Sequence, residues 1–93
     1  MSIEDWRRRF DEIDRKLLEL LNERSRCAIE IGKIKRAQNV PIYDPEREGE
    51  ILRRMKAENP GPLDEEGVQR LFERVIDECR RIETIWGNRG QSD

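Results

Sequence analysis

The 93-residue sequence contains no histidine, only two cysteines and no glycine-rich phosphate-binding loop. The two cysteines, Cys27 and Cys79, stand far apart, each on an apolar helical stripe, so we expect two small buried thiols rather than metal ligands. Without histidine, a serine or cysteine nucleophile also lacks its commonest general base. These absences argue against metal-dependent, nucleophilic and P-loop chemistry.

An excess of charge of one sign and long apolar runs are missing as well. The formal net charge is −2, and no one-sided basic face suited to nucleic acid is present. No apolar run approaches the roughly 20 residues that a membrane-spanning helix needs. The charged start over residues 3–7 does not resemble a signal peptide. We therefore expect a cytoplasmic protein that binds neither nucleic acid nor membrane.

Hydrophobic residues make up only 34% of the chain, whereas 43% of the residues are charged. This composition is that of a single domain with a small hydrophobic core. An unbroken helical pattern over residues 3–37 would extend roughly 50 Å, whereas a compact domain of this length has a radius of gyration of only about 12 Å. Such a helix must project from the fold. We therefore expect a second copy of the chain to cover its apolar side in a homodimer.

Local signals divide the rest of the chain into two further helices. Asp44 followed by Pro45 is typical of an N-cap and a first-turn proline. A third helix is predicted to begin at Asp64 and to end at Gly87. The sequence thus predicts an all-α fold with one long, one short and one medium helix. Its parts are a domain over residues 1–86 and a disordered C-terminal tail over residues 87–93.

The apolar stripe of the first helix is interrupted by Arg24. A guanidinium group at a buried position costs several kcal/mol unless an anion meets it. We interpret Arg24 as part of a pocket for a negatively charged partner. In the alternative, the stem of Arg24 lies along the stripe and its charged end reaches solvent or an internal carboxylate.

Other charged residues are predicted to lie near Arg24. Lys35 follows it by eleven positions, which leaves the two only about 20° apart on one helix face. Arg47 and Glu48 occupy the first turn of the second helix, where anions are readily held, and Glu83 lies beside the apolar stripe of the third. Several cations without a nucleophile favour a small polyanion whose carboxylates are clamped. The alternative is a salt-bridged helical dimer without a site.

Three blocks of the sequence resemble the all-helical chorismate mutases. The order, spacing and identity of these blocks match the family from about residue 4 to residue 83. The chain is most similar to the mutase domain that is fused to prephenate dehydratase in many bacteria. No dehydratase sequence follows here, so a mutase that stands alone is expected. The blocks are residues 14–24 (DRKLLELLNER), 31–35 (IGKIK) and 44–48 (DPERE).

The resemblance implies an intertwined homodimer with two equivalent sites and no cofactor. The implied reaction is the pericyclic rearrangement of chorismate to prephenate, a step of phenylalanine and tyrosine biosynthesis in the shikimate pathway. The resemblance assigns Arg24 and Arg47 to the substrate carboxylates, and Lys35 to the carboxylate region and the ether oxygen. Glu48, helped by the backbone of Asp44, would bind the ring hydroxyl.

Arg7 would reach into the site of the other subunit. It lies about 100° around the helix and roughly 25 Å along the axis from Arg24, so it cannot serve the same site within one chain. Three positions depart from the commonest family pattern. Glu83 stands where many relatives have glutamine, Cys79 replaces a serine that some relatives place against a carboxylate, and Arg80 falls where others have an apolar side chain.

A glutamate can donate a hydrogen bond only when it is protonated. We therefore predict that burial raises the pKa of Glu83, opposed by nearby cations, and that turnover falls as the pH climbs past that pKa. Two other functions stay open. One is an isochorismate-pyruvate lyase with a related pocket, and the other is a catalytically silent helical dimer that acts as a regulatory subunit. Dependence on a partner enzyme of the shikimate pathway is also open.

Overall fold

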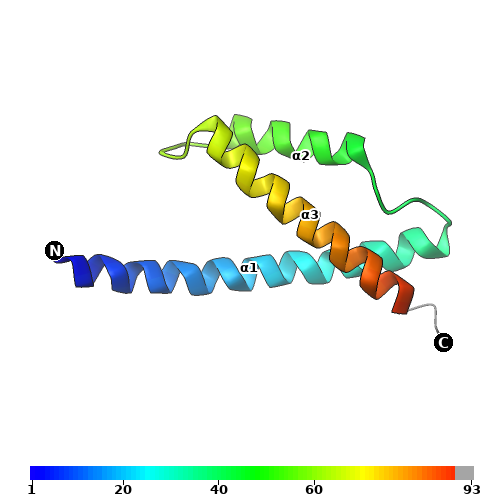
Figure 1. The fold of residues 1–93 in the computed structure, drawn as a ribbon, viewed down its shortest axis with the longest axis horizontal. Coiled ribbons are helices and arrows are strands. Elements are labelled where there is room, and N and C mark those ends of the chain that lie inside the picture. Colours follow the sequence, from blue (N-terminus) through cyan, green and yellow to red (C-terminus); the bar gives the residue numbers. More distant parts are fainter. Residues whose placement is uncertain (90–93) are drawn as a thin grey trace.

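The computed structural model describes residues 1–89, which form three α-helices and no strand. They are α1 (Ile3–Ala37), α2 (Pro45–Glu58) and α3 (Glu65–Arg89) (Figure 1). The predicted all-α fold with one long, one short and one medium helix is therefore confirmed. No helix in the described part of the chain combines the length and the apolar character needed to cross a membrane.

Polar side chains cap the start of each helix. Ser2 and Asp5 form a capping box at the start of α1. Asp44 caps α2 as predicted, because its side chain accepts a hydrogen bond of 3.1 Å from the backbone N–H of Arg47. Asp64 caps α3 in the same way. These caps fix where the chain enters each helix, and the cap of α2 orients the turn that carries Arg47.

The end of α3 differs from the sequence prediction. The helix continues to Arg89, so Gly87 does not end it. A glycine inside a helix costs only about 1 kcal/mol against alanine, which the surrounding turns can offset. Residues 90–93 of the predicted tail lie outside the described residues. The division into a domain and a disordered tail stays a prediction.

The helix α3 connects the other two helices. It crosses the C-terminal half of α1 and packs along α2, whereas α1 and α2 do not pack against each other within residues 1–89 (Figure 1). The buried apolar residues all belong to α3: Val68, Ile76 and Cys79. The radius of gyration is 16.5 Å, well above the roughly 12 Å of a compact domain. The long helix therefore projects from the rest of the chain, as the sequence predicted.

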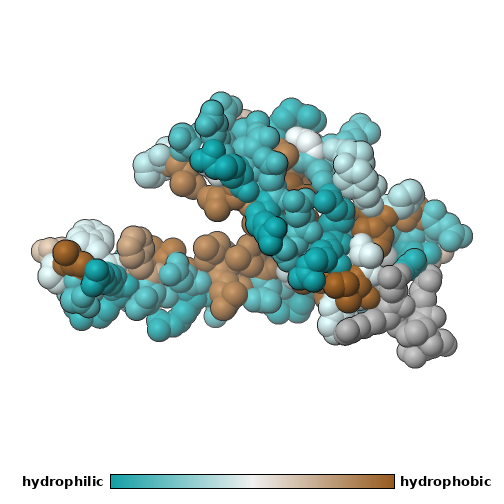
Figure 2. Space-filling model, viewed as in Figure 1, coloured by the Kyte–Doolittle hydropathy of each residue, from teal (hydrophilic) through white to brown (hydrophobic). Residues whose placement is uncertain are grey.

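The projecting half of α1 carries large exposed apolar side chains. Figure 2 shows apolar surface along this half and at the end of the α2–α3 pair that faces it. In the single chain, nothing among the described residues covers this stripe. Its members on α1 are between 44% and 69% exposed: Ile3, Trp6, Phe10, Ile13, Leu17 and Leu20.

Candidate active site

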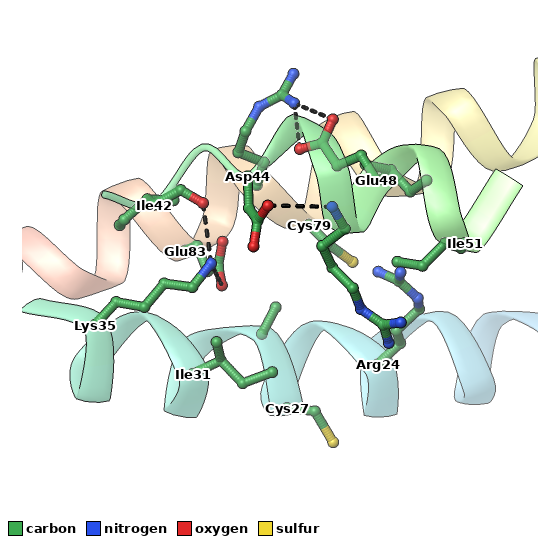
Figure 3. Close-up of a pocket in the computed structure, with 14 residues that line it drawn as sticks. Arg24, Cys27, Ile31, Lys35, Ile42, Asp44, Glu48, Ile51, Cys79 and Glu83 are labelled. Atoms are coloured by element: carbon green, nitrogen blue, oxygen red, sulfur yellow. Dashed lines mark hydrogen bonds and ion pairs between the residues drawn. The ribbon is translucent and has the colours of Figure 1, made fainter. Parts of the chain in front are cut away.

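A pocket of about 360 Å³ lies between the C-terminal half of α1, the start of α2 and α3 (Figure 3). Residues from all three helices and from the α1–α2 connection line it. Isoleucines form much of its apolar wall, and charged side chains supply the rest. The structure brings together here all but one of the predicted site residues: Arg24, Lys35, Asp44, Arg47, Glu48, Cys79 and Glu83.

The exception is Arg7, which lies near the free end of α1. Its Nη1 is 2.9 Å from a carboxylate oxygen of Glu4, and both side chains are exposed. Arg7 and Arg24 are 17 positions apart, which corresponds to roughly 25 Å of helix, so Arg7 does not line the pocket of its own chain. Its predicted role in the site of a second subunit stays a prediction.

Arg24 is half-buried on α1, and its side chain occupies the space between α1 and α2 (Figure 3). Within the described part of the chain it makes no hydrogen bond and no ion pair, so no internal carboxylate neutralises it by direct contact. A guanidinium group in a partly buried pocket gains most when it meets an anion. The geometry therefore favours the interpretation of Arg24 as an anion ligand.

Lys35 joins the end of α1 to the opposite wall of the pocket. Its Nζ donates a hydrogen bond of 3.0 Å to the carbonyl oxygen of Ile42, and lies 3.9 Å from Oε1 of Glu83 (Figure 3). The Lys35 side chain is 21% exposed and that of Glu83 only 10%. The ammonium group is thus held in place while part of its donor capacity still faces the pocket.

Glu83 is a buried carboxyl group, and burial raises its pKa above the usual value. The charge of Glu48 raises the pKa further, whereas the charges of Lys35, Arg24 and Arg80 lower it. The predicted direction and its predicted causes are therefore confirmed. The raised pKa widens the pH range over which the carboxyl group of Glu83 is protonated and able to donate a hydrogen bond into the pocket.

Arg47 and Glu48 lie in the first turn of α2. The Nη1 of Arg47 is 2.7 Å from Oε1 of Glu50, and about half of each side chain is exposed. Asp44 is tied to this turn twice, because its side chain accepts from the Arg47 backbone and its carbonyl oxygen accepts from the Glu48 backbone at 3.0 Å. Arg47 is therefore a half-exposed cation that lines the pocket while it pairs with Glu50, and Asp44 caps the turn that carries it.

The sequence marked Arg80 only as a departure from the family pattern, and missed its role in the pocket wall. Its Nη1 lies 2.7 and 2.6 Å from the two carboxylate oxygens of Glu48, and its Nη2 lies 2.8 Å from Asp77. The guanidinium group also stacks 4.9 Å from the ring centre of Tyr43. The sequence alone could have indicated only the pairing of Arg80 with Asp77, because these two residues are three positions apart on one helix.

The two cysteines differ from each other. Cys79 is buried as predicted, with its Sγ 3.8 Å from the hydroxyl oxygen of Ser25. Cys27 is exposed, and the prediction of a buried thiol is wrong for the single chain. The apolar stripe of α1 extends beyond the surface that α3 covers, and Cys27 lies on the uncovered part. No group of three or more acidic or cysteine side chains within residues 1–89 is placed to hold a metal ion.

Both the sequence and the fold of the chain are similar to those of known proteins. A family model described as chorismate mutase type II matches residues 6–84. A solved structure of chorismate mutase from Thermus thermophilus superimposes with a TM-score of 0.87 at 38% sequence identity. The superposition covers 88% of this chain and 93% of that one.

Two relatives extend the comparison. A bifunctional chorismate mutase/prephenate dehydratase from Neisseria gonorrhoeae is 47% identical over 77 residues, which are 83% of this chain and 21% of the relative. A chorismate mutase from Methanocaldococcus jannaschii is 40% identical over 55 residues, 59% of this chain and 56% of the relative. The chain thus spans about a fifth of the length of the bifunctional proteins that it matches.

Proposed function

Since the chain belongs to the chorismate mutase type II family, we propose that it catalyses the rearrangement of chorismate to prephenate in the pocket between its three helices. The observation that carries this proposal is the unpaired guanidinium of Arg24, which lines one pocket together with Lys35 and Arg47. Chorismate carries two carboxylates, and a clamp of several cations suits a compact dianion. The names of the aligned relatives support the same reaction.

Arg24 and Arg47 would bind the two carboxylates. Arg24 approaches from α1 and Arg47 from α2, so a ligand bound to both would lie across the pocket. Glu48 would accept a hydrogen bond from the ring hydroxyl. Such a clamp holds the flexible enolpyruvyl ether folded over the ring, and this orientation supplies much of the catalysis of a unimolecular rearrangement.

Lys35 and Glu83 would stabilise the transition state. In the rearrangement the carbon–oxygen bond of the ether breaks as a new carbon–carbon bond forms within the same molecule, and negative charge grows on the ether oxygen. Lys35 Nζ and Glu83 Oε1 lie 3.9 Å apart. Two donors at this separation can each reach a single oxygen between them at about 2.8 Å. Protonated Glu83 and Lys35 would therefore both donate to the ether oxygen.

We propose further that the working protein is an intertwined homodimer. The exposed apolar stripe on the projecting half of α1 supports this, because a large contiguous apolar surface indicates a protein contact. The facing apolar end of the α2–α3 pair leaves a hollow that a second long helix could fill (Figure 2). In such a dimer Arg7 of one subunit would complete the site of the other.

Loss of chorismate absorbance with the purified protein alone tests the proposed activity, with chromatography to identify prephenate as the product. We expect turnover by the wild-type protein and at least about a hundredfold less by Arg24→Leu. Isochorismate assayed in parallel separates the lyase, which would release pyruvate. No turnover of chorismate by a folded, dimeric protein would overturn the proposal.

A further inference from the structure

We propose that Arg80 is a positioning residue, which fixes the carboxylate of Glu48 and with it the wall of the pocket that α2 provides. The inference rests on the proposed function, because it concerns how the same site is kept in order. Arg80 belongs to α3 and Glu48 to the first turn of α2. The link between them joins segments that are 32 positions apart in sequence.

The contact has the geometry of a fixed pair. One nitrogen of Arg80 meets both oxygens of Glu48, at 2.7 and 2.6 Å. The second terminal nitrogen is held 2.8 Å from Asp77, and the guanidinium plane is supported by the ring of Tyr43. Both members of the pair are partly buried, with the Arg80 side chain 30% and the Glu48 side chain 22% exposed. Such a pair is less screened by solvent than a surface ion pair.

The arrangement of the helices allows this contact to affect the geometry of the site. Because α1 and α2 do not pack against each other within the described residues, the first turn of α2 is placed over α1 by its contact with α3 and by the short α1–α2 connection, which Lys35 holds at Ile42. Among residues 1–89, two polar side-chain links join α2 and α3. Lys56 and Gln69 form one at the far end of α2, and Arg80 forms the other beside the pocket.

Arg80 also changes what Glu48 presents to a ligand. A bare carboxylate would repel a dianion in the same pocket, and the guanidinium of Arg80 offsets that charge. Two carboxylate oxygens offer about four acceptor positions, and Arg80 occupies one on each oxygen. The positions that remain can accept a hydrogen bond from a ligand hydroxyl. Arg80 thus leaves Glu48 as an oriented acceptor whose charge is largely balanced.

The charge of Arg80 reaches Glu83 as well. The charged groups that act on Glu83 are Lys35 and Arg24 from α1, Glu48 from α2 and Arg80 from α3 itself. Arg80 lowers the pKa of Glu83. Removal of Arg80 should therefore raise the pKa of Glu83 further and move the alkaline fall of activity to higher pH. A side chain that acted only through its apolar packing, and not through its charge, would not shift this limb.

Arg80→Met tests the inference, because methionine keeps an apolar stem of similar reach but cannot bind Glu48. We expect KM for chorismate to rise roughly tenfold, with kcat at low pH within about twofold of wild type, since an interaction present in both ground and transition states is weakened. Arg80→Lys should recover part of the loss. The matched control is Arg81→Met, since Arg81 pairs only with Glu78 on its own helix and should leave KM unchanged.

A double-mutant cycle with Glu48→Gln decides whether Arg80 acts through Glu48. We expect Arg80→Met to change KM by less than about twofold in the Glu48→Gln background. An equal loss in both backgrounds would overturn the inference, because Arg80 would then bind the ligand directly. A wild-type KM and pH limb in Arg80→Met would overturn it too, whereas wild-type protein without turnover would instead count against the proposed function.

Discussion

Gly32 of α1 lies directly against Glu83 of α3. A Cβ atom added at Gly32 would be 3.1 Å from both the Cγ and the carbonyl oxygen of Glu83, and 3.4 Å from its Cα. Gly32 is buried, so no open space lies beside it. The missing side chain therefore sets how closely α3 approaches α1 at the position where Glu83 enters the pocket.

Gly32→Ala should accordingly disturb the site more than the fold. The added methyl group forces Glu83 and its backbone to shift, and a misplacement of a catalytic group by up to 1 Å can cost as much as about a hundredfold in rate. We expect turnover to fall between about tenfold and a hundredfold. Overpacking costs about 1–3 kcal/mol, and alanine regains about 1 kcal/mol of helix propensity. Chorismate kinetics and thermal unfolding measure the two effects.

Gly49→Ala is the matched control for Gly32→Ala. A Cβ at Gly49 would meet only the end of the Arg53 side chain, at 3.3 Å, which can move aside. This variant should keep its activity and gain up to about 1 kcal/mol of stability. Full activity in Gly32→Ala would show that the close approach does not position Glu83.

Glu83→Gln should flatten the pH dependence of turnover. If the protonated carboxyl group of Glu83 donates as proposed, activity is present below its raised pKa and is lost as the pH climbs through that pKa. A glutamine amide donates at every pH. Initial rates from mildly acidic to mildly alkaline pH measure the difference. A variant that keeps the wild-type profile would assign the titration to another group.

The same carboxyl group should make stability depend on pH. The pKa of Glu83 is higher in the folded than in the unfolded protein, so the folded state binds more protons between the two pKa values. This contribution is fully present below the unfolded pKa and is lost as the pH rises through the folded pKa. Urea unfolding at both ends of this window should show the wild-type protein losing more stability than Glu83→Gln. Equal losses in both proteins would mean that Glu83 does not carry the effect.

Local signals were enough to predict the three helices and to place Arg24 and Lys35 on one face of α1. Asp44 begins α2 where the sequence indicated, because capping depends on residues within one turn. Arg24 and Lys35 line one pocket because their separation along a single helix fixes their relative direction. The end of α3 is an exception, because the helix continues past Gly87 to Arg89 although a glycine there indicated a stop.

Contacts between helices were not predictable in the same way. The pairing of Arg80 with Glu48 depends on how α3 crosses α2, and no spacing within one helix specifies that crossing. The exposure of Cys27 follows from how much of α1 is covered by α3, which an apolar stripe alone does not reveal. The family resemblance supplied the roles of the site residues, but not the unusual contact at Arg80.

The Arg24→Leu variant distinguishes the proposed enzyme from the alternative of a catalytically silent helical dimer. If Arg24 binds the substrate, its loss should lower turnover by at least about a hundredfold, as the removal of a charge-stabilising donor usually does. The unfolding free energy should stay equal or rise, because an unpaired, half-buried cation is replaced by an apolar side chain. Chorismate kinetics together with urea unfolding give both numbers. A stabilised variant with full turnover would favour a dimer without a site.

Mixed dimers test whether Arg7 serves the other subunit. Arg7→Ala and Arg24→Leu proteins should each be nearly inactive alone, because every site in either homodimer lacks one cation. When the two are unfolded and refolded together in equal amounts, half of the dimers are mixed, and one of the two sites in each mixed dimer is complete. About a quarter of the wild-type activity should therefore return. If Arg7 acted within its own chain, or had no role in the site, mixing would restore nothing beyond the average of the two variants.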